Sequence, residues 1–296
     1  MFSPIAWYES SVFGQFDSLT AFFLLSGFFL FEKKRESWAF FSFALSVLTK
    51  QHTAVCVLYV LLSRWSSWTL RSKVLNLSIL FAVGSLISLP FILIGGLGSY
   101  LHYVFLPAGW LRYQVPLIYA FSGIGSFLTY VRDVTGKETL FIMQGMKYVQ
   151  LISFSLIGFL IFKRKICFPR AALLGFFVLL GLSSSVNYQY LVGYIPLALY
   201  WASRTTFSEE KFLLLILSVY PSLWLWTFDV GFWFRFMQPT IEGSQELLSY
   251  LGLTREALPD GFYVFFAVVL MFFFLSYIFG TILRWSEQKD TTTSIN

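Results

Sequence analysis

Apolar residues in this chain gather into long runs that recur from one end to the other, separated by short polar or charged stretches. A helix needs about 20 mostly apolar residues to cross a bilayer, so runs of this kind predict membrane-spanning helices. The pattern predicts an all-α, polytopic helical membrane protein of about nine spans, forming a single transmembrane domain over residues 1–296. The expected spans are roughly 16–31, 38–49, 52–64, 74–94, 139–162, 170–186, 188–203, 208–227 and 261–283.

Two longer stretches between these runs are expected to lie on the outer side of the membrane, at 95–138 and 228–260. Within the first, the segment near 116–130 is too short and too interrupted by glycine for a full crossing. Irregular backbone at membrane depth survives only where protein or water covers it, so this segment is expected to be re-entrant or interfacial.

The stretch from Phe13 to His52 carries the most information. It opens with Gly-Gln-Phe-Asp at 14–17, passes through an apolar run to a charged knot at 32–36, and ends its second, shorter run on Lys50. That second run of about twelve residues covers only about 18 Å of a core roughly 30 Å thick. Lys50 is therefore expected to stop below the outer surface and to need a partner such as Asp17 or a phosphate, unless it simply snorkels near a helix end.

The segments around Lys50 allow two arrangements, a hairpin broken at the lysine or one long tilted helix. The hairpin places about two thirds of the 21 Lys and Arg residues on one side, whereas the long helix spreads them almost evenly. Because cytoplasmic loops carry the excess of basic residues, the hairpin is favoured. It places Asp17 and Lys50 on the same, outer side.

The composition limits the classes of function that this chain can have. The chain is 57% hydrophobic and 12% charged, which leaves no room for a water-soluble domain of ordinary size. Its net charge of +6 resides in short knots between apolar runs rather than along one face, so membrane lipids, and no nucleic acid, are the expected partners. Cys56 and Cys167 are expected at different depths and without a disulfide between them, and no metal site is expected, because neither histidine has Cys or acidic residues clustered near it.

Polar side chains gather at the outer ends of the expected spans. A pocket of this kind suits a polar headgroup on a lipid: a cation would hold a phosphate leaving group, and a carboxylate would take a proton from the acceptor. The simpler reading of Asp17 is an acid stabilised by a helix N-terminus. The expected substrate-binding residues are Gln15, Asp17, Lys50, Gln51, His52, Arg112, Tyr188 and Gln189, and Asp17 and Glu9 are the candidates for the catalytic acid or base.

Two motifs carry a resemblance to a known family: "SPIAWYESSVFGQFDSL" at 3–19, and "LTKQHTAV" at 48–55 after the basic knot and the short span. In this order they resemble the GT-C superfamily of membrane glycosyltransferases, above all its mannosyltransferase-like and glucosyltransferase members that use a polyprenyl- or dolichyl-phosphate sugar. "SVNYQYLVGYIPL" at 185–197 is similar to that family's polar stretch before a proline-containing helix. The resemblance implies a GT-C-like bundle, a lipid-phosphate-linked sugar as donor with no certain cofactor, and transfer of a hexose on the extracytoplasmic side.

One departure from the family changes what is expected. The family's catalytic acid lies in an outer loop upstream of the Gly-Gln-Phe run, and this sequence begins at about that point, so that acid has no counterpart and Glu9 is the only acid before Asp17. The sequence therefore leaves open a non-catalytic part of a split transferase, with a second chain supplying the missing N-terminal spans. It also leaves open a translocase or transporter of lipid-linked sugars. A prokaryotic plasma membrane is the expected location, in preference to the endoplasmic reticulum.

Overall fold

The computed structural model describes residues 17–99, 124–183, 189–224 and 260–285, and every regular element in these ranges is helical. Each of the nine expected apolar segments contains a helix. Their bounds, with the additional short helix α8, are α2 Asp17–Glu32, α3 Glu36–Thr49, α4 Ala54–Arg64, α5 Leu70–Gly95, α8 Ile124–Thr135, α9 Leu140–Phe162, α10 Phe168–Leu182, α11 Gln189–Ala202, α12 Ser208–Trp224 and α15 Asp260–Gly280.

The chain breaks at Lys50, as the hairpin arrangement predicts. Lys50 has extended backbone (φ −149°, ψ 117°), and a short 3₁₀ turn, Gln51–Thr53, then leads into α4. The break is held by hydroxyl groups: Thr53 Oγ1 donates to the Lys50 carbonyl, and Ser46 Oγ lies within hydrogen-bond distance of the Thr20 carbonyl on α2. One long helix through Lys50 is therefore excluded.

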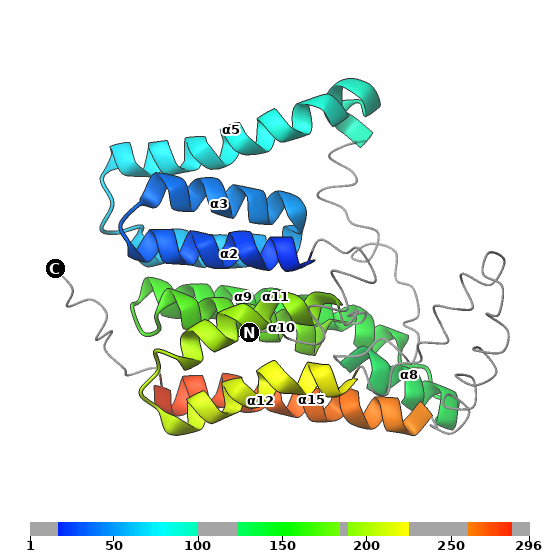
Figure 1. Cartoon of the computed structure of the whole chain (residues 1–296). Coiled ribbons are helices and arrows are strands. Elements are labelled where there is room, and N and C mark those ends of the chain that lie inside the picture. The colour runs from blue at the N-terminus through cyan, green and yellow to red at the C-terminus, as the bar shows by residue number, and fades with distance from the viewer. Residues whose placement is uncertain (1–16, 100–123, 184–188, 225–259, 286–296) are drawn as a thin grey trace, which may run out of the picture.

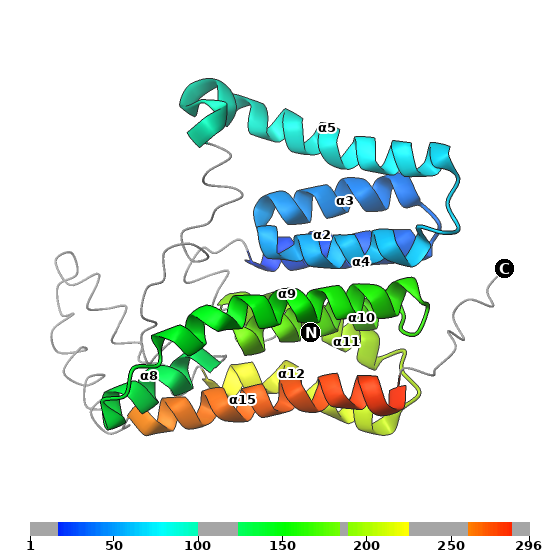
Figure 2. The same ribbon diagram turned by 180° about the vertical axis from the view of Figure 1, so that it is seen from behind.

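The helices stack in layers (Figures 1 and 2). At one edge α5 lies on α3, which packs against α2. A middle layer contains α9, α10 and α11, and α12 and α15 form the opposite edge. The short helix α8 packs mainly against α15 and lies beside the end of the bundle where α15 begins.

Polar contacts show which helix ends lie together. Arg204, just after α11, pairs with Glu32 at the end of α2 at 2.7 Å, and Trp68 before α5 donates to Glu36 at the start of α3 at 2.9 Å. The start of α2 and the end of α3 meet at the other end of the bundle, where Lys50 reaches Asp17. The helices therefore run alternately up and down, and the basic turns and the Asp17 site lie at opposite ends. We call the end with Asp17 the outer end and the end with the basic turns the inner end, after the orientation that the sequence predicts. Over the 16 residues of α2, at about 1.5 Å each, these ends are separated by about 24 Å.

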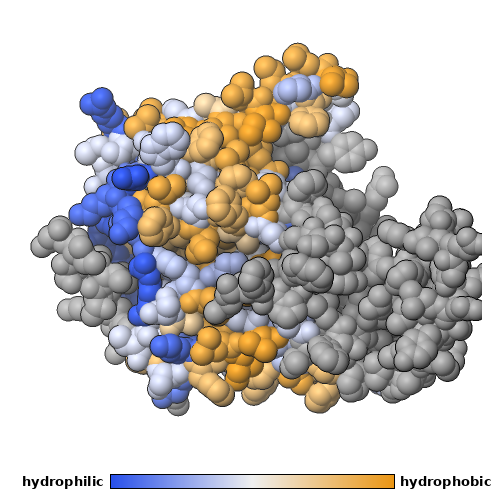
Figure 3. All heavy atoms as spheres, viewed as in Figure 1, coloured by the Kyte–Doolittle hydropathy of each residue, from blue (hydrophilic) through white to orange (hydrophobic). Residues whose placement is uncertain are grey.

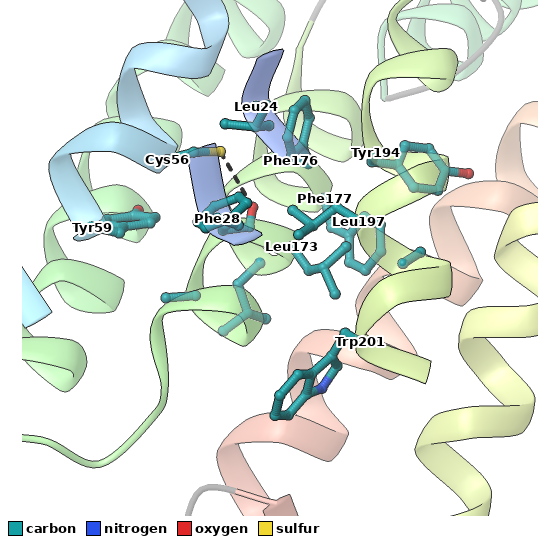
Figure 4. Close-up of a cluster of buried hydrophobic side chains, with 14 of the residues drawn as sticks. Leu24, Phe28, Cys56, Tyr59, Leu173, Phe176, Phe177, Tyr194, Leu197 and Trp201 are labelled. Atoms are coloured by element: carbon teal, nitrogen blue, oxygen red, sulfur yellow. Dashed lines mark hydrogen bonds between the residues drawn. The ribbon is translucent and has the colours of Figure 1, made fainter. Parts of the chain in front are cut away.

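The core lies where α2, α4, α10 and α11 meet (Figure 4). Phe28, Phe177 and Tyr194 are fully buried there, and the thiol of Cys56 faces the carbonyl of Ala172 at 3.9 Å. Both cysteines are free, as expected. Small residues let helices approach closely, as at Gly175, where an added methyl group would lie 3.0 Å from the ring of Tyr59.

The face of the bundle seen in Figure 3 is apolar over much of its described part. In α5 the usual amphipathic pattern is inverted: its buried residues are Asn76 and Ser88, while large apolar side chains such as Phe81 and Leu93 are exposed. A helix whose exposed surface is apolar is suited to lipid. Among the described residues, three helical segments are long and apolar enough to cross a membrane: Leu70–Gly95, Leu140–Phe162 and Val264–Leu283.

Candidate functional site: an outer ion pair below an aromatic ring

Asp17 and Lys50 come together at the outer end of the bundle. Asp17 opens α2, Lys50 follows α3, and the antiparallel packing of these helices places Lys50 Nζ 3.3 Å from Asp17 Oδ2. The two side chains differ in exposure: Asp17 is 1% exposed, whereas Lys50 is 23% exposed. The carboxylate is therefore buried beneath a cation that still reaches the surface.

Helix α11 contributes the third side of the site. The Lys50 ammonium lies 5.2 Å from the centre of the Tyr190 ring, within the range of a cation–π contact. The ring of His52 meets the rings of Tyr190 and Phe176 edge-on, at 5.2 and 5.6 Å. Gly193 lies one turn along α11, and a methyl group there would be 3.6 Å from His52 Nε2.

Several polar atoms of this site have unused capacity. Within the described ranges, no donor meets either carboxylate oxygen of Asp17 in hydrogen-bond geometry, and His52 Nε2 also has no partner. The ion-pair distance of 3.3 Å is longer than the 2.7–2.9 Å typical of a charge-assisted hydrogen bond. An ammonium carries three donors, so Lys50 can bind an anion without first leaving Asp17.

The other expected site residues have mixed outcomes. Gln51 is exposed beside Lys50, on the 3₁₀ turn. Gln189 begins α11, one residue before Tyr190, and its side chain is not described. Four candidates lie outside the described residues: Glu9, Gln15, Arg112 and Tyr188.

A second polar cluster was not expected from the sequence. Arg170 Nε and Nη2 donate to the two carboxylate oxygens of Glu210 at 2.9 and 2.7 Å, and both side chains are almost fully buried. Trp201 and Tyr277 also donate to Glu210 Oε1, at 2.8 and 2.9 Å, and Thr205 donates to Oε2. Each residue stands near the inner end of a different helix or turn. The only signal in the sequence was a charge at the third residue of two apolar helices.

This second cluster is built to hold helices rather than to bind a ligand. Glu210 accepts hydrogen bonds from α10, from α11, from the turn before α12 and from α15, so its lone pairs are taken up by the protein. A buried ion pair is tolerated when its remaining hydrogen-bond capacity is satisfied in this way. The outer site, with its unused acceptors and partly exposed cation, is therefore the candidate binding site.

Comparisons of the chain with protein-family models, with curated proteins and with solved structures find no match. Within the described residues, no group of three or more His, Cys, Asp or Glu side chains could hold a metal ion. A function must therefore be inferred from the residues of the outer site and their geometry.

Proposed function

We propose that this protein is a membrane glycosyltransferase of the GT-C type. It would transfer a hexose from a polyprenyl- or dolichyl-phosphate donor to an acceptor on the extracytoplasmic side, with the donor phosphate at Lys50. Six of the seven shorter helices, all except α8, would cross the membrane together with the three long segments, which gives nine spans. The observation that carries the proposal is the Asp17–Lys50 pair: a buried acid under a partly exposed lysine, at the end of the bundle opposite the basic turns.

The pair suits a lipid phosphate for an electrostatic reason. In transfer, an acceptor hydroxyl attacks the anomeric carbon, the bond from that carbon to the phosphate oxygen breaks, and the lipid phosphate leaves with added negative charge. A cation held where that charge develops lowers the barrier. Asp17 and the Tyr190 ring hold Lys50 in place before the donor arrives, which reduces the ordering needed on binding.

Asp17 is poorly suited to be the base that takes the acceptor's proton. Its carboxylate is only 1% exposed and is paired with the Lys50 ammonium, so an acceptor hydroxyl has little access to it. The base would then come from elsewhere, either Glu9 or an acid on a second chain. This burial favours, as second candidate, the non-catalytic part of a split transferase, which would bind the donor but transfer sugar only with its partner.

Donor binding tests the proposal. The purified protein in lipid nanodiscs is titrated with a radiolabelled polyprenyl-phosphate mannose, and Lys50→Ala is expected to weaken binding at least tenfold, which corresponds to about 1.4 kcal/mol. Lys50→Arg should restore only part of the affinity, because the planar guanidinium is larger than an ammonium and presents its donors in a different geometry. Lys147→Ala is the matched control, since Lys147 also lies over a tyrosine ring, 5.1 Å from that of Tyr148, but away from this site.

Asp17→Asn separates a phosphate site from a purely structural ion pair. If Lys50 binds phosphate, Asp17→Asn should weaken donor binding less than Lys50→Ala does, because it keeps the lysine charge and removes only one of the groups that hold the lysine in place. If the pair only holds α2 and α3 together, Asp17→Asn and Lys50→Ala should impair folding alike and neither should change donor affinity in the folded fraction. That second outcome would overturn the proposal. Sugar transfer by the chain alone would exclude the split-transferase reading.

A further inference from the structure

Two helix-to-helix turns at the inner end of the bundle share one unusual design. Between α2 and α3 the turn is Lys33-Lys34-Arg35, and between α9 and α10 it contains Lys163-Arg164-Lys165. In the first, the Arg35 N–H donates to the Leu30 carbonyl and the Lys34 N–H to the Phe31 carbonyl. The second repeats these bonds one for one, from Lys165 to Leu160 and from Arg164 to Ile161.

This hydrogen-bond pattern is the Schellman motif, and its central residue is left-handed. Glycine usually occupies that position, because a side chain there is strained. Here the position holds Lys34 (φ 59°) and Arg164 (φ 55°), which are the only described non-glycine residues with positive φ. A left-handed backbone is strained for an L-residue with a side chain. A cation at a helix C-terminus is stabilising, but by less than this strain costs, so part of the cost has no folding reason.

The two turns belong to one charged surface. The third inner turn, between α4 and α5, connects them: Arg64 lies 5.9 Å from the Phe31 ring beside the first turn, and Arg164 of the second donates to Ser66 at 3.2 Å. We call this surface the inner basic patch. It consists of Lys33, Lys34, Arg35, Arg64, Arg71, Lys73, Lys163, Arg164 and Lys165.

The patch has an excess of uncompensated charge. None of its nine cations forms an ion pair with any described residue. Of the nearby acids, Glu32 pairs with Arg204, whereas Glu36 accepts from the neutral side chains of Trp68 and Asn76 and keeps its negative charge. Nine neighbouring cations, none of them in an ion pair with a described residue, greatly outnumber the single negative charge of Glu36 and attract an anionic partner.

We propose that the inner basic patch binds the anionic phospholipid headgroups of the membrane surface on its side. The cations stand over aromatic rings at the edge of the apolar surface: Lys73 is 4.9 Å from the Trp65 ring, Lys33 is 5.6 Å from Phe29, and Lys163 is 5.6 Å from Phe159. Lysines that reach headgroup phosphates pack their methylene chains along apolar side chains and extend the ammonium group beyond them. An exposed Trp38 marks the same boundary.

An aromatic border of this kind favours lipid over a dissolved polyanion, which would need only the charges. The patch lies about 24 Å from the Asp17–Lys50 site, the length of α2, so the two proposals are independent. If the proposed donor site at Lys50 proved wrong, the proposal for the inner basic patch would not be affected.

The strained positions make a sharp test possible, because stability and lipid binding should move in opposite directions. The variant carries Lys34→Gly and Arg164→Gly. Unfolding of the purified protein is followed in nanodiscs of phosphatidylcholine alone and of phosphatidylcholine with phosphatidylglycerol, and retained phosphatidylglycerol is counted by native mass spectrometry. In neutral lipid the variant should be at least as stable as the wild type, since glycine relieves the strain.

With phosphatidylglycerol the wild type should gain stability and the glycine variant should lose most of that gain. At about 1 kcal/mol per basic residue, two lost charges weaken lipid binding roughly thirtyfold. The matched control, Lys137→Gln with Lys147→Gln, removes two charges away from the patch and should respond as the wild type does. An equal gain in the wild type and the glycine variant overturns the proposal. So does stabilisation of the wild type by heparin or inorganic phosphate to the extent seen with phosphatidylglycerol.

Discussion

Gly27 is a position in the bundle where any side chain larger than hydrogen would collide with a neighbouring helix. It lies on α2 against the Phe43 ring of α3, so close that an added methyl group would overlap the ring atoms. Phe43 is itself fully buried and packs edge-on against Phe28 and Phe40. The ring therefore has little space to move, and the hairpin that positions Asp17 and Lys50 depends on this contact.

Gly27→Ala should destabilise the protein by about 1–3 kcal/mol, the usual cost of overpacking a core. Gly84→Ala is the control, because a methyl group there meets nothing within 4 Å and alanine is the better helix former, by up to about 1 kcal/mol. Unfolding midpoints of both variants in detergent measure the difference. Equal midpoints would mean that α2 and α3 do not approach as closely as described.

At the scale of elements, the Arg170–Glu210 cluster joins α10, α11, α12 and α15 at their inner ends. Breaking a buried ion pair from one side leaves an uncompensated charge, which typically costs about 3–5 kcal/mol. Glu210→Gln keeps the shape and removes the charge, so it should destabilise the protein by that amount.

The neighbouring residue supplies the control for this prediction. Glu209 stands beside Glu210 in the first turn of α12 but is exposed, and Glu209→Gln should change stability by no more than about 0.5 kcal/mol. Chemical unfolding of the two variants in the same detergent compares them directly. A similarly small loss of stability for both variants would show that the cluster does not stabilise the packing of these four helices.

The basic residues are distributed unevenly between the two ends of the molecule. The inner turns carry most of the described basic residues, whereas Lys50 and Lys137 stand at the other end or in its loops. Basic residues are retained on the cytoplasmic side of a membrane. We therefore expect the Asp17–Lys50 site to face the extracytoplasmic side.

Cysteine labelling in intact cells checks this orientation. In a background without Cys56 and Cys167, Lys137→Cys should react with a membrane-impermeant maleimide added from outside, whereas Ser67→Cys should react only after permeabilisation. Ser67 lies in the turn between α4 and α5 and Lys137 in the loop between α8 and α9, and both residues are exposed. The reverse labelling pattern would place the candidate site in the cytoplasm and would exclude extracytoplasmic transfer.

Local signals were enough to locate the helices but not all their ends. The apolar run predicted a start at residue 74 for the fourth segment, whereas α5 begins at Leu70 because Thr69 caps it by accepting from the Ser72 N–H at 3.2 Å. The break at Lys50 followed from counting charges on either side of the membrane, since that count depends on chain order alone. The same reasoning brought Asp17 and Lys50 to one side.

The sequence by itself determined the helical, apolar character of the chain, the hairpin and the pairing of an acid with a base at its open end, because residue order and hydrophobic length set all three. Only the tertiary structure decided that Tyr190 covers Lys50, that Arg170 meets Glu210, and that two charged turns share one surface. These contacts join helices far apart in the chain, and side-chain packing between helices, which has no periodicity in the sequence, selects them.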